Sequence, residues 1–219
     1  MQVGNNSNSG KIFDIVEDTD NTKVLKEEYE HYYKDKGVNF VKSYFLADGE
    51  REWRDPTTSR KVFFEIFQNI QHSESDVFMD CGCGLGHIVY LASNCYKKVI
   101  GVEVLKSVFE ECCENLKKLI TKNDANVILK NCDMLDLEDD LIDSVTVFYF
   151  ACPFDDITKF RLWLEKILSS FFRNKRRIYF IYYYPIFENE LNNSIFTLEK
   201  TLNSLGKTNI YSVGRSNAQ

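Results

Sequence analysis

The sequence predicts a doubly wound α/β fold, in which a mostly parallel sheet carries helices on both faces. Three observations support this prediction: short apolar segments alternate with helical patterns, the apolar run at 145–150 is continuous, and 44% of the residues are hydrophobic. A continuous apolar strand is typical of a parallel sheet that is buried on both faces. Strands that alternate with helices indicate βαβ units.

The chain of 219 residues has the length of one domain, and we expect residues 57–219 to form it. Residues 1–56 are expected to be an N-terminal segment, partly disordered and otherwise a helical cover over the active site. Residues 1–10 are rich in Asn, Ser and Gly, which favours disorder, and residues 21–45 carry aromatic residues at spacings that suggest short helices.

The first helix of the domain is expected after Pro56, where Thr57 and Thr58 can act as caps. Its apolar residues recur at helical spacing: Val62, Phe63, Ile66, Phe67 and Ile70. Buried parallel strands are expected at 77–79, 99–102, 127–129, 145–150 and 178–184, with helices between them. Two further segments, 195–202 and 210–213, flank a turn at Gly206 and are predicted to form an antiparallel pair.

Composition and charge exclude several classes of protein. The net charge is −6, so nucleic acid is not an expected main partner. No apolar run reaches the roughly 18 residues of a membrane span, and the polar N-terminus is not expected to be a secretory signal. None of the 7 cysteines is spaced C-x-x-C, so we expect no metal site and a reducing, cytoplasmic location.

The main chemical signal is a glycine-rich turn, Asp80-Cys81-Gly82-Cys83-Gly84-Leu85-Gly86, between a strand and a helix. Glycines are needed where the backbone turns sharply and approaches a ligand. A dinucleotide fingerprint would need a small residue at position 87, which is His87. The carboxylate of Asp80 would also repel a pyrophosphate but attract a cation. The charge therefore favours S-adenosylmethionine, which carries an ammonium and a sulfonium and no phosphate.

Four ordered motifs resemble those of class I S-adenosylmethionine-dependent methyltransferases: VFMDCGCGLG, VIGVEV, NCDML and FYFACPF. The chain is similar to small bacterial methyltransferases with a Y-N-P-F motif and to the cofactor core of histone-lysine methyltransferases of the DOT1 type. The resemblance covers roughly residues 57–187. It implies a seven-stranded Rossmann-like sheet with a C-terminal antiparallel strand, and S-adenosylmethionine as cofactor.

The cofactor-binding residues implied by this resemblance are Asp80, Gly82, Gly84, Glu103, Val104, Asp133 and Met134. Glu103 ends the second strand, where a carboxylate can accept hydrogen bonds from both ribose hydroxyls. Asp80 would help to hold the methionine amino group, and Asp133 would accept from the adenine amino group beside Met134. The alternatives are a solvent-facing acid for Glu103, caps for both aspartates, and ordinary core packing for Val104.

The methyl-acceptor side is expected at the exits of the fourth and fifth strands, with Cys152, Phe154 and Tyr182 as candidates. Related families often carry Asn or Asp where this chain has Cys152, which lacks a strong acceptor, so amine methylation of the adenine-N6 kind is placed in doubt. Strand-end packing is the alternative for these residues. His87 is expected to face solvent or to cap a helix, with a role as catalytic base in second place.

The predicted function is methyl transfer to a small-molecule or sugar-like acceptor. Two alternatives stay open: a protein-lysine methyltransferase of the DOT1 type, and a non-catalytic subunit that binds S-adenosylmethionine.

Overall fold

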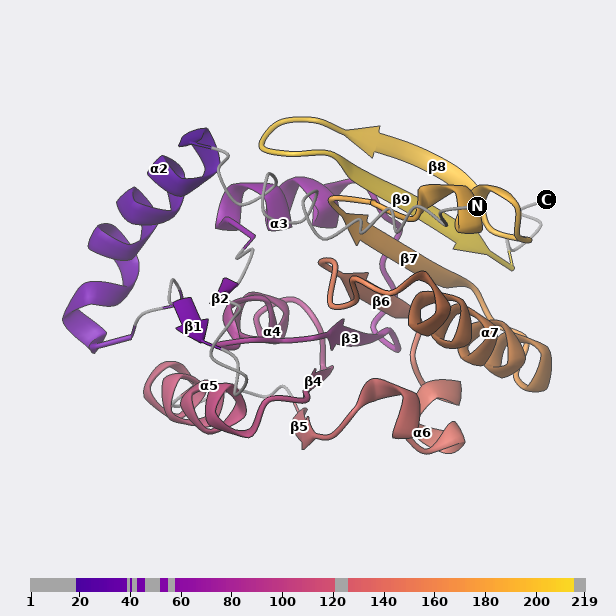
Figure 1. The fold of residues 1–219 in the computed structure, drawn as a ribbon, viewed down its shortest axis with the longest axis horizontal. Helices are drawn as coiled ribbons and strands as arrows, with labels where there is room; N and C mark the ends of the chain where they lie inside the picture. Colours follow the sequence, from indigo (N-terminus) through magenta and orange to yellow (C-terminus); the bar gives the residue numbers. More distant parts are fainter. Residues whose placement is uncertain are drawn as a thin grey trace, which may run out of the picture.

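The computed structural model describes residues 19–38, 40, 43–45, 52–54, 58–120 and 126–214, which form an α/β fold around a seven-stranded sheet (Figure 1). The strands are β3 (Val77–Cys81), β4 (Lys98–Glu103), β5 (Asn126–Asn131), β6 (Val147–Phe150), β7 (Ile178–Tyr183), β8 (Thr197–Leu202) and β9 (Thr208–Val213). Their spatial order is β5-β4-β3-β6-β7-β9-β8. The first five are parallel, and β9 is antiparallel to both β7 and β8, which confirms the predicted fold class.

The helices follow the predicted alternation, with some additions. The α-helices are α2 (Thr19–Glu28), α3 (Arg60–Gln68), α4 (His87–Ser93), α5 (Lys106–Leu119), α6 (Asp139–Asp143), α7 (Ile157–Arg173) and α8 (Glu188–Asn192). Shorter helical turns are η1 (Tyr29–Tyr33), η2 (Lys34–Lys36) and η3 (Met134–Asp136), and β1 (Ser43–Phe45) pairs with β2 (Glu52–Arg54). Among the described residues, no helix combines the length and apolarity needed to cross a bilayer.

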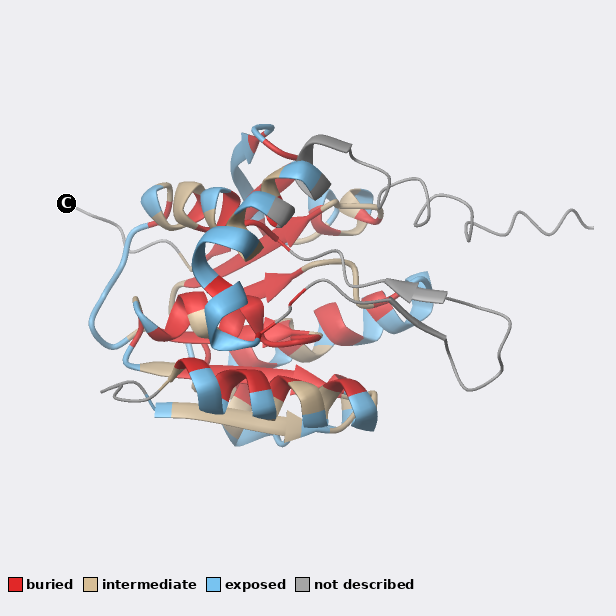
Figure 2. Cartoon of the chain, turned by 90° about the vertical axis from the view of Figure 1, so that its left-hand side faces the viewer, coloured by how far each residue is buried: buried red, intermediate tan, exposed pale blue. Residues whose placement is uncertain are grey.

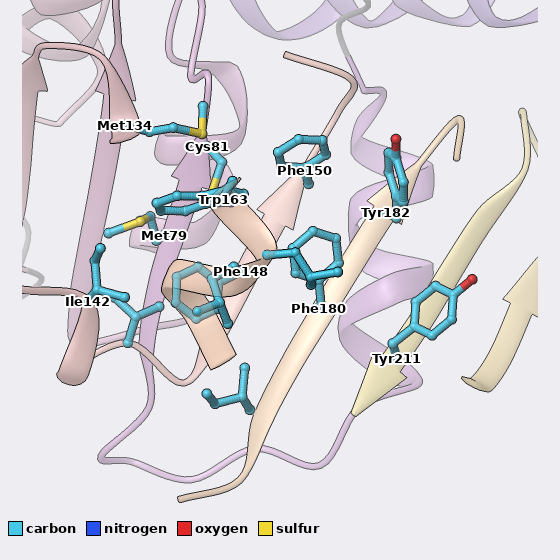
Figure 3. Packing of buried hydrophobic residues seen from close by; sticks show 14 of the residues in the cluster. Met79, Cys81, Met134, Ile142, Phe148, Phe150, Trp163, Phe180, Tyr182 and Tyr211 are labelled. Atoms are coloured by element: carbon cyan, nitrogen blue, oxygen red, sulfur yellow. The ribbon is translucent and has the colours of Figure 1, made fainter. Parts of the chain in front are cut away.

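The helices form two layers because each buries one apolar stripe against a face of the sheet. On one face, α3, α4 and α5 pack on residues such as Phe78, Val99 and Tyr149. On the other face, α7 packs Trp163 and Phe160 against side chains of β3, β6 and β7. Trp163 lies beside Met79 and Cys81 (Figure 3). The buried residues accordingly line the inner sides of the helices and the sheet between them (Figure 2).

The predicted N-cap of α3, Thr57 or Thr58, is corrected to the next residue, Ser59. Its hydroxyl accepts a hydrogen bond from the Val62 N–H at 3.3 Å. The hydroxyl of Thr58 instead bonds to the hydroxyl of Tyr149 on β6. Thr57 and the predicted disordered residues 1–10 lie outside the described residues. The side chain of Thr58 therefore serves a long-range contact that local spacing could not reveal.

Candidate active site

The strand order reverses between β3 and β6, which places a crevice at the carboxyl ends of these strands. Asp80 near the end of β3 lies opposite Gly101 of β4 and Tyr149 of β6. The strand that carries Asp80 and the strand that ends at Phe150 are therefore neighbours in the sheet. Ligands of open α/β sheets bind at such a reversal, so the candidate site is formed by the segments that follow β3, β4, β6 and β7.

The glycine loop after β3 is held against the end of β4. The N–H groups of Gly82 and Cys83 both donate to the Val102 carbonyl, at 3.0 and 2.8 Å. Gly82 has a φ of 88° and Gly84 a φ of 51°, which non-glycine residues rarely adopt. These two glycines therefore let the chain fold back on the neighbouring strand immediately after Asp80.

The same loop touches the exit of β6. A Cβ placed on Gly82 would lie only 2.7 Å from the Cβ of Pro153, too close for two carbon atoms. Glycine is thus required at position 82 for its conformation and also for the approach of Pro153. This contact joins the predicted cofactor loop to the predicted acceptor loop.

Glu103 ends β4 and ties the glycine loop to the segment after the strand. One carboxylate oxygen accepts from the Gly84 N–H at 3.0 Å, and the other accepts from the Leu105 N–H at 2.8 Å. The side chain is buried, and burial raises the pKa of Glu103, an effect that hydrogen bonds from the backbone of Leu105, Gly84 and Val104 partly oppose. A carboxylate has about four lone-pair sites, so the group can still accept from a ligand.

Asp80 and Val104 differ sharply in exposure. Asp80 is buried beside Tyr149, so its carboxylate lies within the fold at the strand reversal. Val104 is 60% exposed, which leaves its side chain accessible to a flat apolar ligand. The side-chain amide of Asn131 fixes this segment by donating to the carbonyls of Glu103 and Val104, at 2.8 and 3.2 Å.

Asp133 and Met134 follow β5. Asp133 is the N-cap of η3, and its Oδ1 accepts from the Leu135 N–H at 2.9 Å. The cap that the sequence left as an alternative is therefore present, and a second carboxylate oxygen remains for a ligand. Met134 is buried in the core cluster with Met79 and Cys81 (Figure 3).

A hydrogen bond from the Cys152 thiol joins the segments that follow β6 and β7. Cys152 has a φ of 51° and Tyr184 a φ of 49°, and they are the only non-glycine residues with positive φ in the described part of the chain. The Cys152 thiol donates to the Tyr184 carbonyl. Burial raises the pKa of Cys152 to about 12, so the thiol stays protonated and acts as a donor at neutral pH.

The other two acceptor-side candidates are buried. Phe154 packs on Phe150 with ring centroids 5.7 Å apart, inside the cluster that α7 covers. Tyr182 is fully buried, stacks on Phe160, and its hydroxyl accepts from the Phe187 N–H at 3.3 Å. Both side chains therefore pack in the core below the strand ends, and their roles toward an acceptor stay predictions.

His87 is not solvent-facing, in contrast to the expectation from the sequence. It is 4% exposed, its Nε2 lies 2.9 Å from the Tyr33 hydroxyl, and its ring stacks on Phe40. Burial, together with the nearby Arg60 charge, lowers the pKa of His87 to about 3, although the Thr58 backbone opposes this in part. The imidazole is therefore neutral at pH 7 and a poor proton acceptor. The apolar residues around it in the sequence, Leu85 and Ile88, were the signal for its burial.

Within the described residues, His, Cys, Asp and Glu side chains form no group of three or more that could hold a metal ion. The basic run of residues 173–177 is also used structurally. Arg176 donates to the carbonyls of Val145 and Ile142 at 2.7 and 2.8 Å, and Arg173 pairs with Asp143 at 2.8 Å. These bonds fasten the end of the molecule opposite the candidate site.

Residues 72–212 match the family described as "Methyltransferase domain", which spans more than half of the chain. No curated protein matches the chain in sequence. Solved structures of similar fold include a precorrin-6y C5,15-methyltransferase from Geobacter metallireducens, with a TM-score of 0.53 and 17% identity over 73% of this chain and 90% of that chain.

A SAM-dependent O-methyltransferase from Thermotoga maritima has a TM-score of 0.53 and 16% identity, covering 76% of this chain and 69% of that chain. A methyltransferase from Geobacter sulfurreducens has a TM-score of 0.52 and 14% identity, covering 74% of this chain and 81% of that chain. At these identities the likeness concerns the fold alone, and the three proteins are similar to this chain only in that respect.

Proposed function

This chain belongs to the methyltransferase-domain family, and on that premise we propose that it is an S-adenosylmethionine-dependent methyltransferase. The observation that carries the proposal is Glu103, a buried carboxylate at the end of β4 that is bonded to the glycine loop at the strand reversal. An acid in this place can accept from ribose hydroxyls while the adjoining loop accommodates the rest of a nucleoside.

The residues after β3, β4 and β5 fit such a cofactor by their chemistry. Asp80 would hold the amino group of the methionine part, and Glu103 would hold the ribose. Val104 and Met134 would contact the adenine, with Asp133 accepting from its amino group. When bound, the cofactor supplies an electrophilic methyl group on a sulfonium. The chain itself has to orient the acceptor and exclude water, which is the main work in an in-line displacement.

We propose a small-molecule or sugar-like acceptor. The net charge of −6 disfavours nucleic acid as acceptor. The Cys152 thiol donates to the Tyr184 carbonyl and offers no strong acceptor atom to an amine, which disfavours lysine. The acceptor is tested by measuring S-adenosylhomocysteine release with three substrate panels: hydroxylated small molecules and sugars, a basic histone-tail peptide, and tRNA. Turnover with the peptide alone would instead support the DOT1-type alternative.

A non-catalytic subunit that binds the cofactor is the second candidate. It is favoured by the engaged thiol of Cys152 and by the burial of Phe154 and Tyr182, which leave little free chemistry among the acceptor-side candidates. Tight binding of S-adenosylhomocysteine with no turnover on any of the three panels would favour it over an enzyme.

The N-terminal segment is proposed to be a cover over the site. Tyr33, Val38 and Phe40 are buried in one cluster with Leu85 of the glycine loop and Val108 of α5. This packing holds the described residues of the segment against the glycine loop and α5.

The choice of cofactor is tested by thermal unfolding with S-adenosylmethionine, S-adenosylhomocysteine and NAD. A ligand at ~100 times its Kd should add about 2.7 kcal/mol to the free energy of unfolding. We expect this with both S-adenosyl compounds and no change with NAD. Stabilisation by NAD alone would overturn the proposal.

A further inference from the structure

One face of α5 packs directly against the glycine loop. Cys112, Asn115 and Leu116 lie on the buried side of this helix. A Cβ placed on Gly86 would lie 2.8 Å from the Cys112 Sγ and 3.2 Å from the Leu116 Cγ, so the loop approaches the helix as closely as a glycine allows. The loop therefore contacts α5 as well as the end of β4.

Asn115 places a polar amide on this buried face. The residue is 7% exposed, and the buried residues beside it on the helix are Cys112, Leu116 and Leu119. Asparagine is a poorer helix former than leucine, and burial of its amide costs free energy unless the amide is hydrogen-bonded. An asparagine in this stripe therefore indicates a specific partner.

That partner is the glycine loop itself. Asn115 Nδ2 lies 3.2 Å from the Leu85 carbonyl oxygen. A carbonyl only accepts, so the atom that faces it must be the amide nitrogen, which donates. Leu85 lies between Gly84 and Gly86, whose φ angles are 51° and 90°. The bond thus fixes the chain between two glycines, where the backbone alone imposes little restraint.

Asn115 and Glu103 fix neighbouring residues of the loop. A Glu103 carboxylate oxygen accepts from the Gly84 N–H at 3.0 Å, and the Asn115 amide donates to the carbonyl of the next residue. The loop is thereby held from β4 and from α5 before any ligand arrives. A loop that is already fixed loses less conformational freedom when a ligand binds, which raises the affinity.

We propose that Asn115 is a positioning residue that fixes the glycine loop in its binding conformation and so raises the affinity for S-adenosylmethionine. It acts through the Leu85 carbonyl and not through contact with the cofactor. This inference rests on the proposed function. Without the amide, the Leu85 carbonyl loses this donor, and the loop has to be ordered at the moment of binding.

The first test compares Asn115→Ala with Asn209→Ala. Asn209 is also a buried asparagine, but its amide donates to Glu188 and Tyr211, which are not residues of the loop. Both variants should lose stability in urea unfolding, because each removes a buried hydrogen-bonded amide. In calorimetry with S-adenosylhomocysteine, we expect binding about 5- to 30-fold weaker in Asn115→Ala and within about 2-fold of the wild type in Asn209→Ala. Equal weakening in both would overturn the proposal, since affinity would then follow stability alone.

Asn115→Leu separates the lost donor from lost packing. Leucine is close to asparagine in shape and is a better helix former, so this variant should fold even if Asn115→Ala does not. We expect it to bind S-adenosylhomocysteine as weakly as Asn115→Ala, because it cannot donate to the Leu85 carbonyl. Wild-type affinity in folded Asn115→Leu protein would overturn the role of the amide.

Asn115→Asp adds a pH profile that a merely structural role would not produce. An ionised carboxylate cannot donate and repels the Leu85 carbonyl, whereas the protonated acid donates through its O–H. Burial raises the pKa of a carboxylic acid, so protonation should occur at moderately low pH. We expect the affinity of the variant, divided by that of the wild type at the same pH, to rise between about pH 8 and about pH 5. The ratio removes the effect of Glu103, which both proteins share, and a constant ratio would contradict the proposal.

The outcomes separate this inference from the proposed function. If the wild type fails to bind S-adenosylhomocysteine at all, the proposed function is wrong and the role of Asn115 falls with it. If the wild type binds and the Asn115 variants bind equally well, only the role of Asn115 is overturned. Circular dichroism at the temperature of the binding experiment establishes that each variant is folded.

Discussion

The two halves of the sheet's carboxyl edge are built in opposite ways. After β3, the positive φ angles fall on glycines, with 88° at Gly82 and 51° at Gly84. After β6 and β7, the same backbone conformation falls on Cys152 and Tyr184, at 51° and 49°. For a residue with a Cβ this conformation costs roughly 1–2 kcal/mol, and for glycine almost nothing.

The difference between the two halves shows where backbone strain is tolerated in this molecule. The cofactor half has backbone donors paired to the Val102 carbonyl and to Glu103, so its geometry is relaxed and hydrogen-bonded. In the acceptor half, the Cys152 thiol links the two strained residues by bonding to the carbonyls of Tyr183 and Tyr184. Strained residues concentrate at functional sites, where the surrounding structure fixes them. The acceptor half is therefore the part whose shape depends on long-range packing.

The largest expected effect comes from Gly82→Ala, which places a Cβ on a residue of the cofactor half that has a positive φ. The new Cβ combines strain of about 1–2 kcal/mol with overpacking of about 1–3 kcal/mol against Pro153. We expect a loss of about 2–5 kcal/mol in urea unfolding, with loss of S-adenosylhomocysteine binding. Gly37→Ala is the control, since its φ is 62° but no atom lies within 4 Å. Equal losses at both positions would show that Pro153 does not press on the loop.

Phe154→Ala tests the acceptor half. Removing this buried ring from beside Phe150 should cost about 3 kcal/mol of stability, at the lower end for such truncations. At a temperature where the variant is folded, we expect turnover to fall more than cofactor affinity, because the residue lies on the acceptor side. Parallel losses of turnover and S-adenosylhomocysteine affinity would contradict the division into two halves.

Glu103→Ala tests the hydrogen bonds of the cofactor half. Loss of a charged acceptor should weaken S-adenosylhomocysteine by about 1–3 kcal/mol in calorimetry. It should also destabilise the fold, because the N–H groups of Gly84 and Leu105 lose their partner. Glu103→Gln keeps one carbonyl acceptor and should lie between the wild type and Ala. Unchanged affinity in folded Glu103→Ala protein would mean that the ribose site is elsewhere.

Cys152 offers a smaller effect that sharpens the comparison. Asn tolerates positive φ and its amide can donate to the Tyr184 carbonyl, so Cys152→Asn should keep the stability within about 0.5 kcal/mol. Cys152→Val is β-branched and cannot donate, and we expect it to be about 1–2 kcal/mol less stable than Asn in thermal unfolding. If Val proves as stable as Asn, the conformation at position 152 is not strained.

The smallest effect concerns pH. Because burial raises the pKa of Glu103 above 4.5, the folded state binds a proton that the unfolded state has released over the interval between these values. The contribution of Glu103 to the free energy of unfolding therefore falls as the pH rises through this interval, and the slope should be smaller in Glu103→Gln. S-adenosylhomocysteine affinity should fall as the pH is lowered through the same interval, as titrations in matched buffers will show.

Local patterns determined most of the fold. Apolar runs and helical spacing located the five parallel strands and the helices between them, because a buried strand and an amphipathic helix each leave a periodic pattern in the sequence. The positions of the glycine loop and of Glu103 could also be predicted from the sequence, since glycine at positive φ and an acid at a strand end are local features. The cap of α3 is Ser59 and not the predicted Thr57 or Thr58, and the Thr58 hydroxyl instead bonds to Tyr149 on a distant strand.

The sequence by itself thus determined the sheet, the loop after Asp80 and the acid that ends the second parallel strand. Only the tertiary structure decided that His87 is buried against Tyr33 and Arg60, and that Cys152 and Tyr184 share a strained contact. The physical reason is the range of the interactions. Backbone conformation and periodic burial act over a few neighbouring residues, whereas His87 and Tyr33 are 54 positions apart and Cys152 and Tyr184 are 32 positions apart.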